Sequence, residues 1–163
     1  MHEIVALDPF DLRLLALLQE DGRLAAQDLA DRVGLSPSQC SRRRLRLEAA
    51  GLIVGYYARL DAGRLGFGVV AFVQVTLARH SPDNARHFRG LVERTSAIQQ
   101  AHAVTGDADY LLRVVVPDLR ALGALVNDVL LPHGSVAHVR SMVALDGLKD
   151  TTSLPLDAVA PSS

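Results

Sequence analysis

The first part of the chain shows a helical pattern of apolar residues. Between Phe10 and Leu18 the apolar residues recur at helical spacing and form one stripe. Asp8 is a suitable N-cap for this segment, and Pro9 suits the first helical position. A second, shorter helix is expected at about residues 26–32, where an apolar face recurs.

The third predicted helix has the strongest start signal in the chain. Ser36 is an N-cap residue, Pro37 fits the first helical position, and Gln39 completes a capping box. Gly34 supplies the turn that separates this helix from the one before it. Two helices joined by a tight glycine turn, the second rich in arginine, are typical of a helix-turn-helix. We therefore predict a recognition helix over residues 36–50 that enters the major groove of DNA.

The segment after this helix favours extended structure. Residues 53–60 contain β-forming side chains around Gly55, which indicates a strand pair or wing. Residues 1–60 are thus expected to form a winged helix-turn-helix DNA-binding domain. A short linker with two glycines follows at about residues 61–66.

From residue 67 onward, β-type and helical patterns alternate. Capped segments that begin at Ser81 and Asp118 predict two helices among four strands. The order β-α-β-β-α-β is that of the ferredoxin-like split unit, so the chain is expected to be an α+β protein. The predicted strands are residues 67–77, 98–104, 110–116 and 136–145.

Such a sheet carries its helices on one face, so its other face needs a cover. The chain supplies no further elements, and a second copy is the economical partner. A twofold homodimer also suits two DNA-binding heads that read a pseudo-palindrome. Residues 67–150 are predicted to form this oligomerisation domain, with a flexible tail at residues 151–163.

Composition and charge sharpen this picture. Of the 163 residues, 49% are hydrophobic, which is ample for packed cores. The net charge is only −1, so the whole molecule is not a polycation. Four arginines nevertheless fall within five positions, at Arg42, Arg43, Arg44 and Arg46. A local basic cluster on a nearly neutral protein is typical of one DNA-facing element.

Other classes of protein are disfavoured. No apolar run approaches the ~20 residues that a membrane span needs, and residues 1–7 lack the pattern of a secretory signal. The single cysteine, Cys40, excludes an intramolecular disulfide. We expect a cytoplasmic protein that does not bind membranes.

The predicted recognition helix offers two kinds of DNA contact. Its early residues would meet base edges, whereas arginines farther along would meet phosphates, which position the protein without reading sequence. The alternative is an ordinary arginine-rich solvated face, but the turn, the cap and the preceding helix together favour DNA. The expected base-contacting residues are Ser38, Gln39, Ser41 and Arg42, and the expected phosphate contacts are Arg43 and Arg46.

Several motifs taken together resemble the Lrp/AsnC family of transcription regulators over about residues 7–150. The resemblance implies a regulator that senses an amino acid or a related metabolite. It also implies dimers formed through the C-terminal domain, assembly of dimers into octamers, and an effector bound between dimers. The motifs are Leu7-Asp8, Asp21-Gly22-Arg23, Val33-Gly34-Leu35-Ser36-Pro37-Ser38, Leu47-Glu48, Gly55-Tyr56, Thr105-Gly106-Asp107-Ala108-Asp109-Tyr110 and Val116-Pro117-Asp118.

The resemblance places the effector near the glycine-aspartate loop after the second strand. Carboxylates there suit an ammonium group, and backbone amides around Gly106 suit a carboxylate. The alternative is an ordinary β-hairpin turn, because Gly-Asp is common in turns. The effector-binding residues expected from the resemblance are His102, Thr105, Gly106, Asp107 and Asp109, with Met142, Val143 and Ala144 as lining.

Two positions depart from the family pattern. Arg44 shares a helical face with Cys40 and Leu47, where a branched apolar residue is usual. Either the helix rotates slightly, or Arg44 buries its stem and extends its charged head outward. His102 stands where leucine-responsive members tend to carry an apolar side chain, which argues against leucine as the effector.

Three other functions are alternatives to this interpretation. The six histidines include no pair at the spacing of a helical or finger-like metal site, so no metal is expected. The sequence contains no nucleophile elbow, phosphate-binding glycine loop or acid–base pair, so no catalytic residue or cofactor is expected. An architectural DNA-binding protein that needs no ligand remains an alternative to the regulator.

Overall fold

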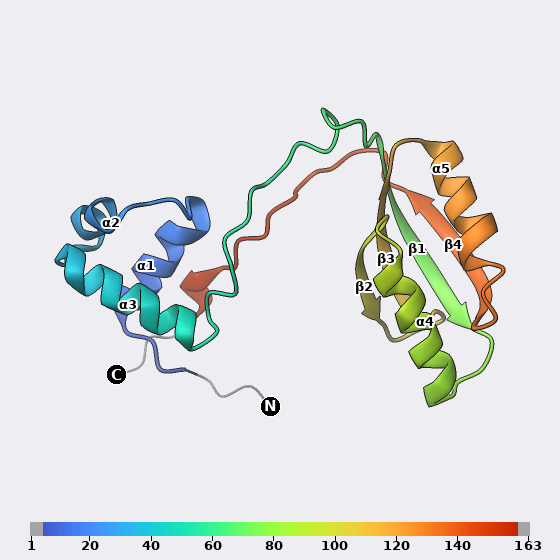
Figure 1. The fold of residues 1–163 in the computed structure, drawn as a ribbon, viewed down its shortest axis with the longest axis horizontal. Helices are drawn as coiled ribbons and strands as arrows, with labels where there is room; N and C mark the ends of the chain where they lie inside the picture. The colour runs from blue at the N-terminus through green and yellow to red at the C-terminus, as the bar shows by residue number, and fades with distance from the viewer. Residues whose placement is uncertain (1–4, 160–163) are drawn as a thin grey trace. The chain divides into compact units, whose positions relative to one another are not determined.

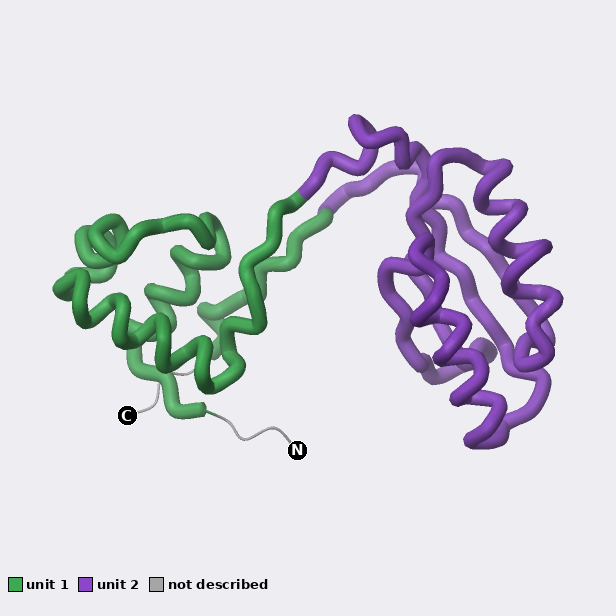
Figure 2. The backbone as a smooth tube through the Cα atoms, in the orientation of Figure 1, with its two compact units in different colours: residues 1–59, 150–163 green, residues 60–149 purple. Residues whose placement is uncertain are grey.

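The protein is described here by a computed structural model that covers residues 5–159. The chain divides into two compact units (Figure 2). Within the described residues, unit 1 contains residues 5–59 and 150–159, and unit 2 contains residues 60–149. Each unit has its own hydrophobic core.

Unit 1 is built on three helices, labelled in Figure 1: α1 (Pro9–Glu20), α2 (Ala26–Val33) and α3 (Pro37–Ala49). The apolar stripe of α1 is buried, as the sequence pattern predicts. Together the three helices enclose a small core whose fully buried members include Leu14, Leu29, Val33, Cys40 and Leu47.

The predicted helix starts are confirmed by their capping bonds. The Asp8 carboxylate accepts from the Asp11 amide, while the Asp11 carboxylate accepts from the Asp8 amide. Ser36 and Gln39 form the same reciprocal pair at the start of α3. Gly34 ends α2 with a φ of 80°, the left-handed geometry that glycine adopts at low cost.

The segment after α3 contains no strand, although its sequence predicts a strand pair or wing. Residues 53–60 form no strand, and unit 1 has none within its described residues. Only some of its β-forming side chains pack on the helices, because Val54 and Tyr57 are 83% and 84% exposed. Ile53 contacts the core, and the Tyr56 hydroxyl donates to the Glu48 carboxylate over 2.8 Å. A strand needs a backbone hydrogen-bond ladder, and none joins residues 53–60 to another described segment, although Arg59 donates to the Asp150 carbonyl over 2.9 Å.

The C-terminal segment also departs from the predicted free tail. Two hydrogen bonds join the Gln19 side chain to the backbone of Leu154, at 3.2 and 2.7 Å. A short 3₁₀ turn, Leu156–Ala158, follows and helps to line a shallow hollow along α1. Residues 151–159 are thus tied to unit 1, and the rest of the predicted tail lies outside the described residues.

Unit 2 has the predicted β-α-β-β-α-β order. Its four strands form one antiparallel sheet in the spatial order β2-β3-β1-β4, which confirms the ferredoxin-like fold. The elements are β1 (Val69–Leu77), α4 (Pro82–Arg94), β2 (Ile98–Ala103), β3 (Tyr110–Val116), α5 (Leu119–Ala124) with its π-helical continuation η1 (Leu125–Leu130), and β4 (Val136–Val143).

Both helices of unit 2 cover the same face of this sheet (Figure 1). Val73 and Val75 of β1 are fully buried there, together with Phe88 of α4. The alternate positions point to the other face, where Phe72 and Met142 are 38% and 42% exposed. One broad face of the sheet therefore has no cover within unit 2, residues 60–149.

Candidate DNA-binding surface and effector site

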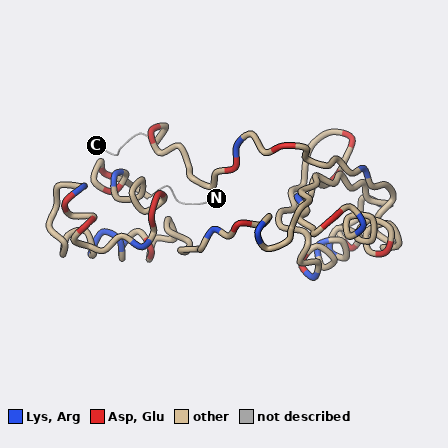
Figure 3. The backbone as a smooth tube through the Cα atoms, turned by 90° about the horizontal axis from the view of Figure 1, so that it is seen from above, with Lys and Arg blue, Asp and Glu red and all other residues tan. Residues whose placement is uncertain are grey.

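The N-terminal half of α3 presents polar side chains to solvent. Ser38, Gln39 and Arg42 are exposed, and Ser41 is half-buried. The Gln39 oxygen serves the cap of the helix, which leaves its amide nitrogen free. No hydrogen bond or ion pair joins the Arg42 side chain to another described residue. Arg42 is thus a cation available to an external anion. The basic positions are closely spaced along this helix (Figure 3).

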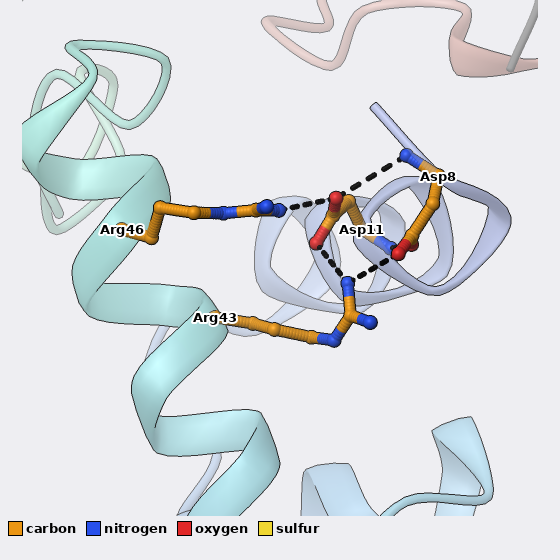
Figure 4. A network of polar contacts seen from close by, with 4 residues as sticks. All are labelled: Asp8, Asp11, Arg43 and Arg46. Carbon is orange, nitrogen blue, oxygen red and sulfur yellow. Dashed lines mark hydrogen bonds and ion pairs between the residues drawn. The ribbon is translucent and has the colours of Figure 1, made fainter. Parts of the chain in front are cut away.

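Arg43 and Arg46 lie on the side of α3 that meets α1 (Figure 4). The Arg43 Nη1 atom lies 2.6 Å from an Asp8 oxygen and 2.8 Å from an Asp11 oxygen. Arg46 donates through Nη2 to the other Asp11 oxygen. The Asp11 side chain is only 1% exposed, so these two arginines neutralise a buried carboxylate.

This network shifts the ionisation of its members. Burial alone would raise the pKa of Asp8, but the Asp11 amide and the Arg43 guanidinium together hold this pKa below its usual value of 3.8. The carboxylates of Asp11 and Asp8 raise the pKa of Arg43. Arg43 also lies 5.6 Å from the centre of the Phe10 ring. Arg43 is therefore held inside unit 1 by three neighbours.

The sequence analysis does not predict the burial of Asp11, although the sequence contains a signal for it. Asp11 lies on the apolar side of α1, four residues after Leu7 and four residues before Leu15. A charged residue at a core position requires a partner of opposite charge. The arginine cluster of α3 is the obvious source of that partner.

The predicted effector loop joins β2 to β3. Gly106 has a φ of 114°, a conformation that L side chains rarely adopt. Thr105 and Asp107 are exposed. Asp109 is engaged: one of its oxygens accepts from the Leu77 amide over 2.7 Å, and the other lies 3.4 Å from Nδ1 of His80. Of the two carboxylates, that of Asp107 is the one left open to a ligand.

Met142, Val143 and Ala144 do not lie beside this loop within one chain. Met142 on β4 pairs with Phe72 near the start of β1. The loop instead bonds to the far end of β1, where the Asp109 amide donates to the Val75 carbonyl. The predicted effector set is thus split between opposite ends of the sheet. Residues 142–144 and the loop share a site only if another copy supplies one of them.

His102 lies close to the loop, as predicted. It is exposed on β2 and pairs with Leu111 of β3, one step from the end of the hairpin. Leu111 itself alternates with the buried Leu112, which places it on the uncovered face of the sheet. His102 shares that face, because paired residues on neighbouring strands point the same way.

Residues 5–159 contain neither a metal-ligand cluster nor a membrane-spanning helix. No group of three or more histidine, cysteine or acidic side chains is placed to hold a metal ion within this range. Across the same residues, no helix combines the length and apolar character needed to cross a membrane.

Comparisons with known proteins agree on one family. Residues 7–54 match the family model of a winged helix-turn-helix DNA-binding domain, and residues 70–154 match that of the Lrp/AsnC ligand binding domain. The leucine-responsive regulatory proteins of Salmonella typhimurium and of Escherichia coli K12 are each 40% identical over 148 residues. That alignment spans 91% of this chain and 90% of each relative.

Solved structures agree with the sequence relatives. A transcriptional regulator from Neisseria meningitidis, in complex with L-Met, matches with a TM-score of 0.90 and 39% identity, covering 93% of this chain and 97% of that one. An AsnC family regulator from Agrobacterium tumefaciens matches with a TM-score of 0.88 and 37% identity, covering 94% and 99%. The chain therefore belongs to the Lrp/AsnC family of transcription regulators.

Proposed function

We propose that this protein is a sequence-specific DNA-binding transcription regulator whose DNA binding or assembly responds to an amino acid or a related metabolite. The observation that carries the proposal is the exposed, polar N-terminal half of α3, which begins at a fully formed capping box. In a helix-turn-helix these residues enter the major groove. The protein acts in this proposal as a binding protein and not as an enzyme.

Base contacts are assigned to Ser38, Gln39, Ser41 and Arg42. Serine, glutamine and arginine side chains all match donor and acceptor patterns of base edges. Arg46 is assigned to phosphate, because its side chain is 53% exposed. Arg43 is only 23% exposed and bridges two carboxylates, so its main role is inside unit 1.

We place the effector at the β2–β3 loop. The open backbone around Gly106 can meet a carboxylate, and the free carboxylate of Asp107 can meet an ammonium group. Thr105 and His102 flank this loop and complete the proposed contacts. The L-Met bound to the Neisseria relative supports an amino acid as the ligand class. Asp109 supports the loop from behind, and residues 142–144 join the site only from a second copy.

A homodimer is the proposed basic assembly, with octamers built from dimers. Its support is the uncovered face of the sheet in unit 2, which carries exposed apolar side chains such as Phe72 and Met142. A second copy of the same face would bury them and would provide two DNA-binding units. Since the proposed target is chromosomal DNA, we assign the protein to the cytoplasm.

The test is thermal unfolding of the purified protein against the twenty amino acids and a few keto acids. A ligand at 100 times its dissociation constant adds ~2.7 kcal/mol, enough to raise the unfolding midpoint by several degrees. One responder that also changes binding to promoter DNA supports the proposal. If no compound shifts the midpoint or the DNA binding, the protein is either an architectural DNA-binding protein or a regulator whose effector lies outside amino-acid metabolism.

A further inference from the structure

We propose that Asp11 is a positioning residue for DNA binding, which holds the Arg46 guanidinium at the angle where its free N–H groups meet a DNA phosphate. This inference rests on the proposed DNA-binding role of α3. It assigns a function to a buried carboxylate on a different helix, which does not itself face DNA.

The Asp11 carboxylate is saturated by donors from three places. One oxygen accepts from Nη1 of Arg43 over 2.8 Å. The other accepts from Nη2 of Arg46 and, over 3.2 Å, from the Asp8 amide. Because the carboxylate also caps α1, its position is fixed by the backbone of that helix. The two arginines are therefore tied to a rigid point (Figure 4).

Arg46 and Arg43 contact the Asp11 carboxylate in different ways. Arg43 bridges Asp8 and Asp11 and is 23% exposed, which makes it an anchor between α1 and α3. Arg46 is 53% exposed and gives Asp11 a single nitrogen. Its other two nitrogens have no partner among the residues that the structure describes. A planar guanidinium has five N–H donors in fixed directions, so a bond at one edge fixes where the others point.

A free arginine side chain loses conformational entropy when it is ordered on a phosphate. A guanidinium already held by Asp11 has lost much of this freedom before DNA arrives. Charge alone predicts the opposite effect of Asp11, because a carboxylate near the interface repels phosphate. The two accounts therefore predict opposite changes in DNA affinity when the Asp11 carboxylate is neutralised.

The experiment measures binding of a non-specific DNA duplex by fluorescence anisotropy over a range of salt. Asp11→Asn keeps the shape of the side chain and an oxygen for the Asp8 amide. We expect it to weaken binding by roughly 3- to 10-fold and to flatten the slope of log K against log salt by about 0.9, as the loss of one phosphate contact does. Arg46→Ala should do the same, and the double variant should add no further loss.

Asp31→Asn is the matched control, since it removes one exposed carboxylate from α2 of the same unit. It should leave binding unchanged or tighten it. Arg46→Lys provides a second test that spares Asp11: one ammonium cannot reproduce the fork, so binding should fall as far as in Arg46→Ala. Circular dichroism and melting establish that each variant is folded at the assay temperature, and the Arg46→Lys result decides the matter if Asp11→Asn unfolds.

The outcomes separate the two levels of the proposal. Tighter or unchanged binding by Asp11→Asn, or full binding by Arg46→Lys, overturns the positioning role of Asp11. If neither Arg42→Ala nor Arg46→Ala weakens DNA binding, the proposed recognition surface itself is wrong.

Discussion

The guanidinium of Arg44 lies over the ring of Tyr56, with 4.8 Å between its central carbon and the ring centroid. Glu48 holds both partners, accepting from Nε of Arg44 over 3.1 Å and from the Tyr56 hydroxyl over 2.8 Å. Cys40 on the same helix is fully buried, so the helix has not rotated. The structure favours the second possibility for Arg44, because its side chain is 32% exposed and its charged head reaches an aromatic ring.

Arg44→Ala should lower the free energy of unfolding by about 1 kcal/mol, since it removes a cation–π contact and an i,i+4 ion pair. Chemical denaturation followed by circular dichroism measures this. Arg42→Ala, which removes an arginine two positions away without a partner in the described chain, should change stability by less than ~0.5 kcal/mol. Equal losses at both positions would show that the Arg44 contacts add nothing.

The local elements could be predicted because their signals lie within a few residues of each other. The capping box at Ser36 and the branched run at Tyr110–Val116 required no knowledge of the rest of the chain. Contacts between segments that are distant in the sequence were harder to predict. The partners of Asp11 lie 32 and 35 positions away, on a helix whose rotation had to be known first.

The predicted effector-binding residues also depend on contacts between distant segments, which local sequence does not show. The resemblance to the family indicated the loop around Gly106, but the distance of this loop from Met142 depends on strand order and register. The strand expected at residues 53–60 failed for a related reason. Side-chain propensity favours extended backbone, whereas a strand also requires a partner, which no local pattern shows.

Gly22 is needed for the close approach of Tyr56. A Cβ atom at this position would lie 2.7 Å from the Tyr56 ring. Gly22→Ala should therefore displace the ring and destabilise the protein by ~1 kcal/mol or more. In a Tyr56→Ala background the same substitution should cost nothing, because the clash is gone. A cost that persists in this background would mean that the backbone conformation, and not the ring, requires glycine.

The C-terminal segment should lose protection from hydrogen exchange when its hydrogen bonds to Gln19 of α1 are removed. Gln19→Ala deletes both side-chain bonds to the Leu154 backbone. Hydrogen exchange at the Leu154 amide should then accelerate, since this amide donates to the Gln19 oxygen over 2.7 Å. Gln27→Ala on α2 is the control, and it should leave that amide unchanged. Unchanged exchange in Gln19→Ala would mean that other contacts hold the segment.

Asp8 should make stability dependent on acid pH. Burial acts to raise the pKa of Asp8, but the Asp11 amide and Arg43 outweigh it, and the folded pKa lies below 3.8. A depressed folded pKa means that the contribution is complete above the unfolded pKa and is lost as the pH falls through the folded one. Asp8→Asn keeps an N-cap but does not titrate. The melting difference between parent and variant should be large at pH 7 and shrink as the pH is lowered to 3; a constant difference would contradict this.

The two aspartates of the loop should respond differently to substitution. Asp109 accepts from the Leu77 amide, with its side chain only 24% exposed, so Asp109→Ala leaves that amide without its partner. We expect a loss of ~1–3 kcal/mol of stability, whether or not an effector is present. Asp107→Ala removes an exposed carboxylate and should leave the unliganded melting midpoint within about one degree of the parent.

The effector-dependent shift should be abolished in Asp107→Ala, because this carboxylate is the one available to an ammonium group. Thermal unfolding with and without the responding amino acid measures both quantities in one series. An Asp107→Ala protein that keeps the full ligand shift would remove Asp107 from the site. If Asp109→Ala instead kept its stability and lost only the ligand shift, its bond to Leu77 would be dispensable, and Asp109 would be the residue that meets the ligand.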